Sequence, residues 1–274
     1  MTGLRPRLLA ALCLAAFGLT GCLAVTRPVV KIGLVAPFEG RYRAVGYEVI
    51  YAVRLAVREA NTAGGVAGYS VELVALDDAG DPDMAAEQAR KLAVDPQVVG
   101  VLGHWLEATT LAAAPKYADA GLPVLATAAG GDLPAPALRL WRRSACFLDT
   151  GLGCAQALED LQLAGGAPFT VTVPAPLPAD STDPAFAERY LALSNGVQPR
   201  FNAVLAYDAA RLLLDAVARD IADNKTPTRA GVGALLAASN FAGLSGPIRF
   251  DAARNWAAAP AWTYLWDGTD LTRP

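Results

Sequence analysis

Short apolar runs alternate with longer amphipathic stretches over the first 126 residues of the chain. Each run is rich in valine and leucine and has the length of a buried strand, whereas the stretches between them repeat apolar residues three and four positions apart, as on one face of a helix. The pattern predicts strands over residues 29–35, 70–76, 98–102 and 123–126, and helices over 47–61, 83–94 and 109–120.

This alternation of strands and helices is typical of an α/β protein with a doubly wound parallel sheet. Ligands of such sheets bind outside the carboxyl ends of the strands. The loops expected at that edge are 37–46, 77–81, 103–108 and 127–132. In the second loop, Asp81 is the expected N-cap of the next helix, with Pro82 at its first position.

The rhythm changes after Leu133. We expect a strand over residues 170–173, a proline-rich connector over 174–184, helices over 185–194, 203–222 and 229–238, and strands over 247–250 and 262–266. Roughly 60 residues separate the fourth strand from the helix at 203, and a free-standing α/β lobe needs about 100. A second lobe, if present, is therefore reduced.

The N-terminus has the order of a bacterial lipoprotein signal. Arg5 and Arg7 precede an apolar run over residues 8–17, which is too short to span a membrane. The tetrapeptide Leu-Thr-Gly-Cys that ends at Cys22 resembles a lipobox. We expect a signal peptide over 1–21, a lipid on Cys22, a tether over 22–28, and an extracytoplasmic chain anchored to the cell membrane. The alternative is an ordinary signal peptide that ends in a chance cluster of small residues.

Composition narrows the classes of function. The chain has 274 residues, 54% of them hydrophobic, and 23 basic and 26 acidic residues give a net charge of −3. No basic stripe suggests nucleic acid as a partner. Cys13 would leave with the signal peptide, so Cys146 and Cys154 remain as an expected disulfide in an oxidising compartment. One histidine, His104, is too few for a zinc site, and we expect no metal and no cofactor.

Enzyme signatures are weak. His104 lacks a G-x-S-x-G partner motif and is better explained as a strand-end histidine near a binding loop. The triplet Asp149-Thr150-Gly151 matches half of an aspartic-protease site, which needs a second carboxylate from a homodimer. The aspartates of 77–83 miss the calcium-loop pattern because Ala79 occupies the second ligand position. We expect a protein that is not an enzyme.

Several stretches in sequence order carry a family resemblance: KIGLVAPFEG, LAVREANTAGGVAG, VELVALDDAGDP, VVGVLGH and YADAGLPVLATAA, then FNAVLAYDAARLLLDAV, FAGLSGPIRFD and WTYLWDG. Together they resemble the type I periplasmic binding proteins of the Leu/Ile/Val (branched-chain amino acid) ABC-transporter substrate-binding family, with a truncated second lobe.

The resemblance implies two α/β lobes that are joined by three crossovers, close on a small ligand and deliver it to an ABC transporter permease. It assigns residues 29–138 and 200–250 to the first lobe. It assigns residues 139–199 and 251–274 to the remnant of the second lobe and the crossovers.

The resemblance also implies where a ligand would bind. Glu107 stands where the family has a serine that binds the ligand carboxylate, and the fourth-strand loop has lost the family's threonine hydroxyl. The residues implied are Tyr42, Val45, Trp105, Glu107, Ala128, Ala129 and Gly130.

The expected function is that of an extracytoplasmic solute-binding lipoprotein for amino acids or a related small polar solute. The alternative is a degenerate lipoprotein that keeps one lobe as an interaction or sensory module without a transport ligand.

Overall fold

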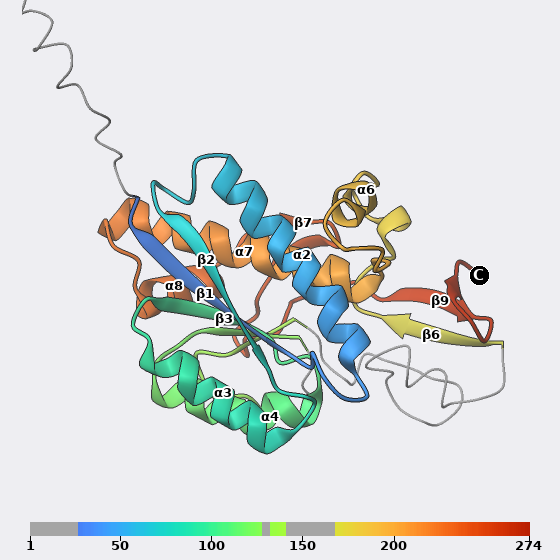
Figure 1. Ribbon diagram of the computed structural model, residues 1–274, viewed down its shortest axis with the longest axis horizontal. Helices are drawn as coiled ribbons and strands as arrows, with labels where there is room; N and C mark the ends of the chain where they lie inside the picture. Colours follow the sequence, from blue (N-terminus) through green and yellow to red (C-terminus); the bar gives the residue numbers. More distant parts are fainter. Residues whose placement is uncertain (1–26, 128–131, 141–167) are drawn as a thin grey trace, which may run out of the picture.

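The computed structural model describes residues 27–127, 132–140 and 168–274 (Figure 1). Cys22, Cys146, Cys154 and the triplet at Asp149 lie outside these residues, so the expected lipid anchor and disulfide stay predictions.

A parallel five-stranded sheet forms the centre of the molecule. Its strand order is β2–β1–β3–β4–β5, and every neighbouring pair is parallel. The predicted α/β class with a doubly wound parallel sheet is confirmed. The strands are β1 (Val29–Ala36), β2 (Ser70–Asp77), β3 (Val98–Leu102), β4 (Val124–Ala126) and β5 (Leu138–Arg139).

Helices cover both faces of this sheet (Figure 1). On one face α2 (Arg43–Thr62) packs beside α7 (Phe201–Asn224), and α8 (Arg229–Ala237) packs against α7 and β3. On the other face lie α3 (Pro82–Val94) and α4 (Glu107–Asp119). Within the described residues, no helix combines the length and the apolar character needed to cross a bilayer.

The first helix begins earlier than its sequence indicates. We predicted a loop through Gly46 and a helix from Tyr47, but α2 already begins at Arg43. Gly46 lies in the first turn of the helix, where a Cβ atom would stand 2.2 Å from the carbonyl oxygen of Pro37. The glycine is therefore needed for a close approach between helix and loop, and not for a turn.

One guanidinium group joins several segments at the amino edge of the sheet. Arg229, the first residue of α8, donates hydrogen bonds to the carbonyl oxygens of Val98 (3.0 Å), Ala93 (3.0 Å), Asp95 (2.7 Å) and Ala120 (3.3 Å). These carbonyls belong to the ends of α3 and α4 and to the start of β3, so a residue late in the sequence fixes three earlier elements.

A smaller antiparallel sheet has the order β10–β9–β6. The strands predicted over 170–173 and 262–266 are confirmed as β6 (Phe169–Val173) and β9 (Trp262–Trp266), and β10 (Leu271–Thr272) adds a short edge. The strand predicted over 247–250 is β8 (Gly246–Arg249), which pairs with the unpredicted β7 (Asn240–Gly243). Between β6 and α7 lie the short helices η2 (Pro178–Asp180) and α6 (Phe186–Leu191).

A buried carboxylate on α7 holds the turn between β7 and β8. Asp208 is 1% exposed, and its two oxygens accept hydrogen bonds from the backbone N–H groups of Leu244 (2.6 Å) and Ser245 (2.8 Å). Burial raises the pKa of Asp208 to about 6. The carboxylate therefore takes the place of a missing strand partner for these two N–H groups.

We expect Asp208→Ala to lower the free energy of unfolding by about 3 kcal/mol at pH 7.5, because two buried N–H groups lose their acceptor. Asp215→Ala on the same helix is the matched control, since Asp215 is exposed and forms only an ion pair with Arg219 within the helix. The control should cost less than about 0.5 kcal/mol. Urea denaturation measures both, and equal losses in the two variants would contradict the assigned role.

Candidate functional site

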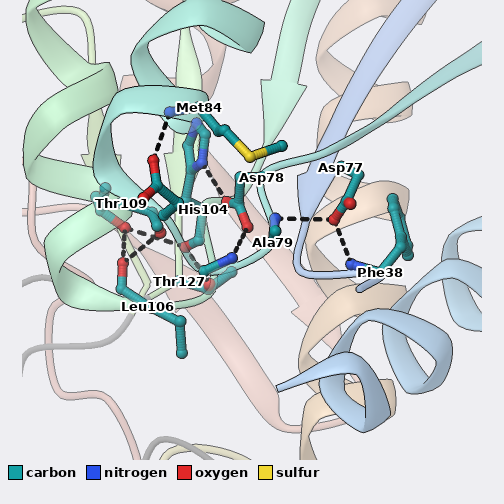
Figure 2. A network of polar contacts seen from close by, with 12 residues as sticks. Phe38, Asp77, Asp78, Ala79, Met84, His104, Leu106, Thr109 and Thr127 are labelled. Atoms are coloured by element: carbon teal, nitrogen blue, oxygen red, sulfur yellow. Dashed lines mark hydrogen bonds and ion pairs between the residues drawn. The ribbon is translucent and has the colours of Figure 1, made fainter. Parts of the chain in front are cut away.

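The loops after the parallel strands meet at the carboxyl edge of the large sheet. β1 lies between β2 and β3, so the chain leaves the sheet in opposite directions on either side of β1 and opens a crevice there. The Asp77 carboxylate at the end of β2 accepts hydrogen bonds from the backbone N–H groups of Phe38 (2.7 Å) and Ala79 (2.8 Å) (Figure 2). The first two loops are thereby joined to each other.

The His104 side chain joins the loops after β2 and β3. Its Nδ1 lies 2.7 Å from Oδ2 of Asp78, and its Nε2 lies 3.1 Å from the hydroxyl of Tyr117 on α4. His104, Asp78 and Tyr117 are all buried. Burial raises the pKa of the Tyr117 hydroxyl far above its ordinary value, and the nearby Asp78 adds to this effect. Tyr117 is thus a neutral phenol, and the His104 ring contacts structural partners.

The backbone of His104 binds the loop after β4 as well. Its carbonyl oxygen accepts hydrogen bonds from the hydroxyls of Thr127 (2.7 Å) and Thr110 (3.1 Å) (Figure 2). Four successive loops of the predicted binding edge are therefore connected by buried hydrogen bonds. This confirms the interpretation of His104 as a strand-end histidine beside the predicted binding loops.

The aspartates of the second loop serve as structural acceptors. Asp81 accepts a hydrogen bond from the backbone N–H of Met84 and caps α3, and Pro82 is the first residue of that helix, as predicted. Asp78 also accepts one from the backbone N–H of Gly80 (3.0 Å). Within the described residues, no group of three or more acidic, histidine or cysteine side chains could hold a metal ion.

Two of the predicted ligand residues lie at the start of α2. Tyr42 precedes the helix, is half-buried, and carries the Arg41 guanidinium 5.0 Å from its ring centre. Val45 is buried in the first turn. Tyr42 and Leu106 both approach Gly80, so the first and third loops are in contact through apolar side chains.

Two further predicted residues follow β3. Trp105 is only 2% exposed and belongs to the same hydrophobic core as Val45, and its buried indole nitrogen has no hydrogen-bond partner among the described residues. Glu107 is half-exposed at the first position of α4, where the helix dipole favours a negative charge. Ala128, Ala129 and Gly130 lie outside the described residues.

A cavity of about 250 Å³ lies between the first turns of α2 and α7. Arg43, Val45 and Glu48 line it from α2, and Arg200 and Asn202 line it from the return segment. Of the predicted residues, the structure places Val45 in this cavity, whereas Tyr42, Trp105 and Glu107 do not line it. Sequence reasoning missed the other four.

Glu48 binds the start of α7 to α2. One of its carboxylate oxygens accepts hydrogen bonds from the backbone N–H groups of Arg200 (2.9 Å) and Ala203 (2.8 Å), and its backbone carbonyl accepts one from the Tyr190 hydroxyl (2.9 Å). Burial raises the pKa of the Glu48 carboxyl to about 7, against the opposing effect of the two N–H groups. The available signal was a charged residue on the apolar face of a helix, three positions after Val45 and four before Ala52.

Residues 29–140 match the family model of the periplasmic binding proteins. The chain is 34% identical over 97 residues to the Leu/Ile/Val-binding protein homolog 2 of Brucella abortus. It is 34% identical over 123 residues to the leucine-, isoleucine-, valine-, threonine-, and alanine-binding protein of Pseudomonas aeruginosa. These matches cover 35% and 45% of this chain but only 26% and 32% of the relatives' own length.

The fold is similar over a longer part of the chain. A branched-chain amino acid transporter substrate-binding protein of Streptococcus pneumoniae, solved with isoleucine, has a TM-score of 0.69 at 18% identity and covers 89% of this chain and 97% of its own. A solute-binding protein of an ABC transporter of R. palustris, solved with benzoate, has a TM-score of 0.65 at 19% identity, with 90% and 97% covered. The resemblance to type I periplasmic binding proteins is therefore confirmed, by sequence for residues 29–140 and by fold beyond them.

The buried Glu48 predicts a pH-dependent stability. Its folded pKa of about 7 lies above its ordinary value of 4.5, so the folded state binds more protons than the unfolded state between these values. The free energy of unfolding should fall by about 3 kcal/mol as the pH rises through this window. Asp208 adds a decrease of the same sign at somewhat lower pH.

We expect Glu48→Gln to remove most of the slope near pH 6–7 and to be more stable than the wild type at pH 8, because the amide oxygen accepts the same hydrogen bonds without a charge. Glu39→Gln, at an exposed carboxylate, is the control and should leave the slope unchanged. Denaturant unfolding between pH 5 and 8 measures this, and an unchanged slope in Glu48→Gln would show that this carboxyl titrates elsewhere.

Proposed function

We propose that this protein is a lipid-anchored, extracytoplasmic solute-binding protein that delivers amino acids or related small polar solutes to an ABC transporter permease. The observation that carries the proposal is that residues 29–140, which match the periplasmic binding proteins, form the whole buttressed carboxyl edge described above. Branched-chain amino acid binding by the named relatives supports the class of solute.

The lobe assignment follows from the same argument. Residues 29–138 and 200–250 supply the large sheet, its helices and the β7–β8 hairpin, and we assign them to the first lobe. Residues 139–199 and 251–274 contribute the smaller sheet and the connections, and we assign them to a reduced second lobe. The ligand would bind at the crevice between the loops of Tyr42–Val45 and Trp105–Glu107, with Ala128, Ala129 and Gly130 on its third side.

Glu107 shapes the expected choice of ligand. Two like charges about 4 Å apart repel each other by roughly 4 kcal/mol at an effective dielectric constant near 20. A ligand carboxylate placed at Glu107 would lose much of the ~8 kcal/mol of a micromolar complex. An amine or amide group suits this position better, because it donates hydrogen bonds to a carboxylate.

We expect the wild type to bind leucinamide, in its uncharged form, more tightly than leucine, and Glu107→Ser to improve leucine binding at least tenfold. Titration calorimetry measures both, with Glu87→Ser, at an exposed carboxylate on α3, as the control that should change neither. Tight leucine binding by the wild type, unchanged in Glu107→Ser, would show that the site lies elsewhere. Absence of binding in a wider thermal-shift screen of amino acids, amides and small peptides would favour an interaction or sensory module.

The anchor is tested separately. In a bacterial host, Cys22→Ala should be released from the membrane fraction because the acylated thiol is lost. Cys13→Ala is the matched control, since this cysteine lies in the expected signal peptide, and it should stay membrane-bound. A Cys22→Ala protein that remains in the membrane fraction with its N-terminal segment uncleaved would indicate a signal anchor instead of a lipid.

A further inference from the structure

A second cavity, of about 310 Å³, lies where the large and the small sheet are connected. Three stretches of chain line it: the end of β5 with Leu140, the end of β6 with Pro174, and residues of the 251–261 segment that leads from β8 to β9. It shares no lining residue with the cavity between α2 and α7. It is therefore a separate space from the crevice of the proposed function.

A buried cation is part of its wall. Arg139 lines the cavity, is 7% exposed, and donates a hydrogen bond from Nη1 to Oδ1 of Asn255 at 2.6 Å. Its backbone is fixed on both sides, because its N–H donates to the carbonyl of Arg254 and its carbonyl accepts from the N–H of Trp256, each at 2.9 Å. The guanidinium is thus held in one place, and its planar fork matches the geometry of a carboxylate.

The other walls are mostly apolar. Leu140, Val173, Pro174 and several alanines line the cavity, together with the buried Trp256. The indole nitrogen of Trp256 donates to the carbonyl of Pro247 at 3.0 Å, so this polar group is already satisfied. A fixed guanidinium among apolar walls favours an anion with an apolar body over a strongly hydrated ion such as phosphate.

We propose that this cavity binds a small organic carboxylate, with the carboxylate on Arg139 and the apolar body against Trp256 and Pro174. The volume is at the lower end of the range of small-molecule sites, which limits the ligand to a short aliphatic or single-ring acid. Such a ligand contacts all three connections between the sheets at once.

The probe is 3-phenylpropionate, titrated calorimetrically into the purified mature chain, with 3-phenylpropionamide as its neutral counterpart. We expect the carboxylate to bind and the amide to bind at least tenfold more weakly, because the amide lacks the charge that Arg139 recognises. Equal affinities of the two compounds, or no binding of 3-phenylpropionate, would overturn the proposal.

Two variants locate the site. Arg139→Gln should weaken 3-phenylpropionate binding at least tenfold. If that variant fails to fold, Ala259→Leu fills the cavity from its exposed rim without changing Arg139 and should weaken binding to the same extent. Ala252→Leu, at an exposed position that does not line the cavity, is the control. Binding that survives Ala259→Leu would overturn the proposal.

The proposed function fails or stands independently of this site. Leucinamide binding should be unchanged in Ala259→Leu, and 3-phenylpropionate binding should be unchanged in Glu107→Ser. If 3-phenylpropionate binding instead depended on Glu107 and not on Ala259, it would belong to the crevice, and the second site would be disproved.

Discussion

The carboxyl edge of the large sheet depends on one buried contact, between the imidazole of His104 and the carboxylate of Asp78. Both side chains are almost completely removed from water, so loss of either partner would leave a buried polar group unsatisfied, at a cost of about 1–3 kcal/mol or more. The same histidine reaches α4 through Tyr117 and the fourth loop through Thr127. A ligand at this edge would meet loops that are already ordered, which reduces the entropy that binding must overcome.

Buried carboxylates also fix the segments that come back to this lobe late in the sequence. Glu48 accepts the first N–H groups of α7, and Asp208 accepts those of the β7–β8 turn. Each binds backbone groups that have no strand or helix partner, and each has its pKa raised by burial. The return of the chain is therefore set by directional hydrogen bonds in addition to the apolar contacts of α2 with α7.

The sequence predicts what local pattern controls. The parallel strands, their helices and the Asp81–Pro82 start of α3 follow from apolar periodicity and capping chemistry. Features that depend on distant contacts were not predictable. Gly46 is indistinguishable in sequence from a turn glycine until Pro37 is placed beside it, and β5, with two residues, is too short to show a strand pattern. In the candidate site, Val45 reached a cavity wall, whereas Trp105 turned into the core because a large apolar ring gains more there than at a rim.

The hydrogen bonds of Arg229 have a consequence for how the molecule is made. This residue, with α7 just before it, completes elements that were synthesised more than 100 residues earlier. A nascent chain that ends near residue 140 would expose the sheet face that α7 covers, and the carbonyls at the amino edge would lack their donor. The lobe therefore acquires its final packing only after residues 201–237 have been added, because contacts of long sequence separation form late. Synthesis thus includes a long interval with an incompletely folded chain, as export in the unfolded state requires.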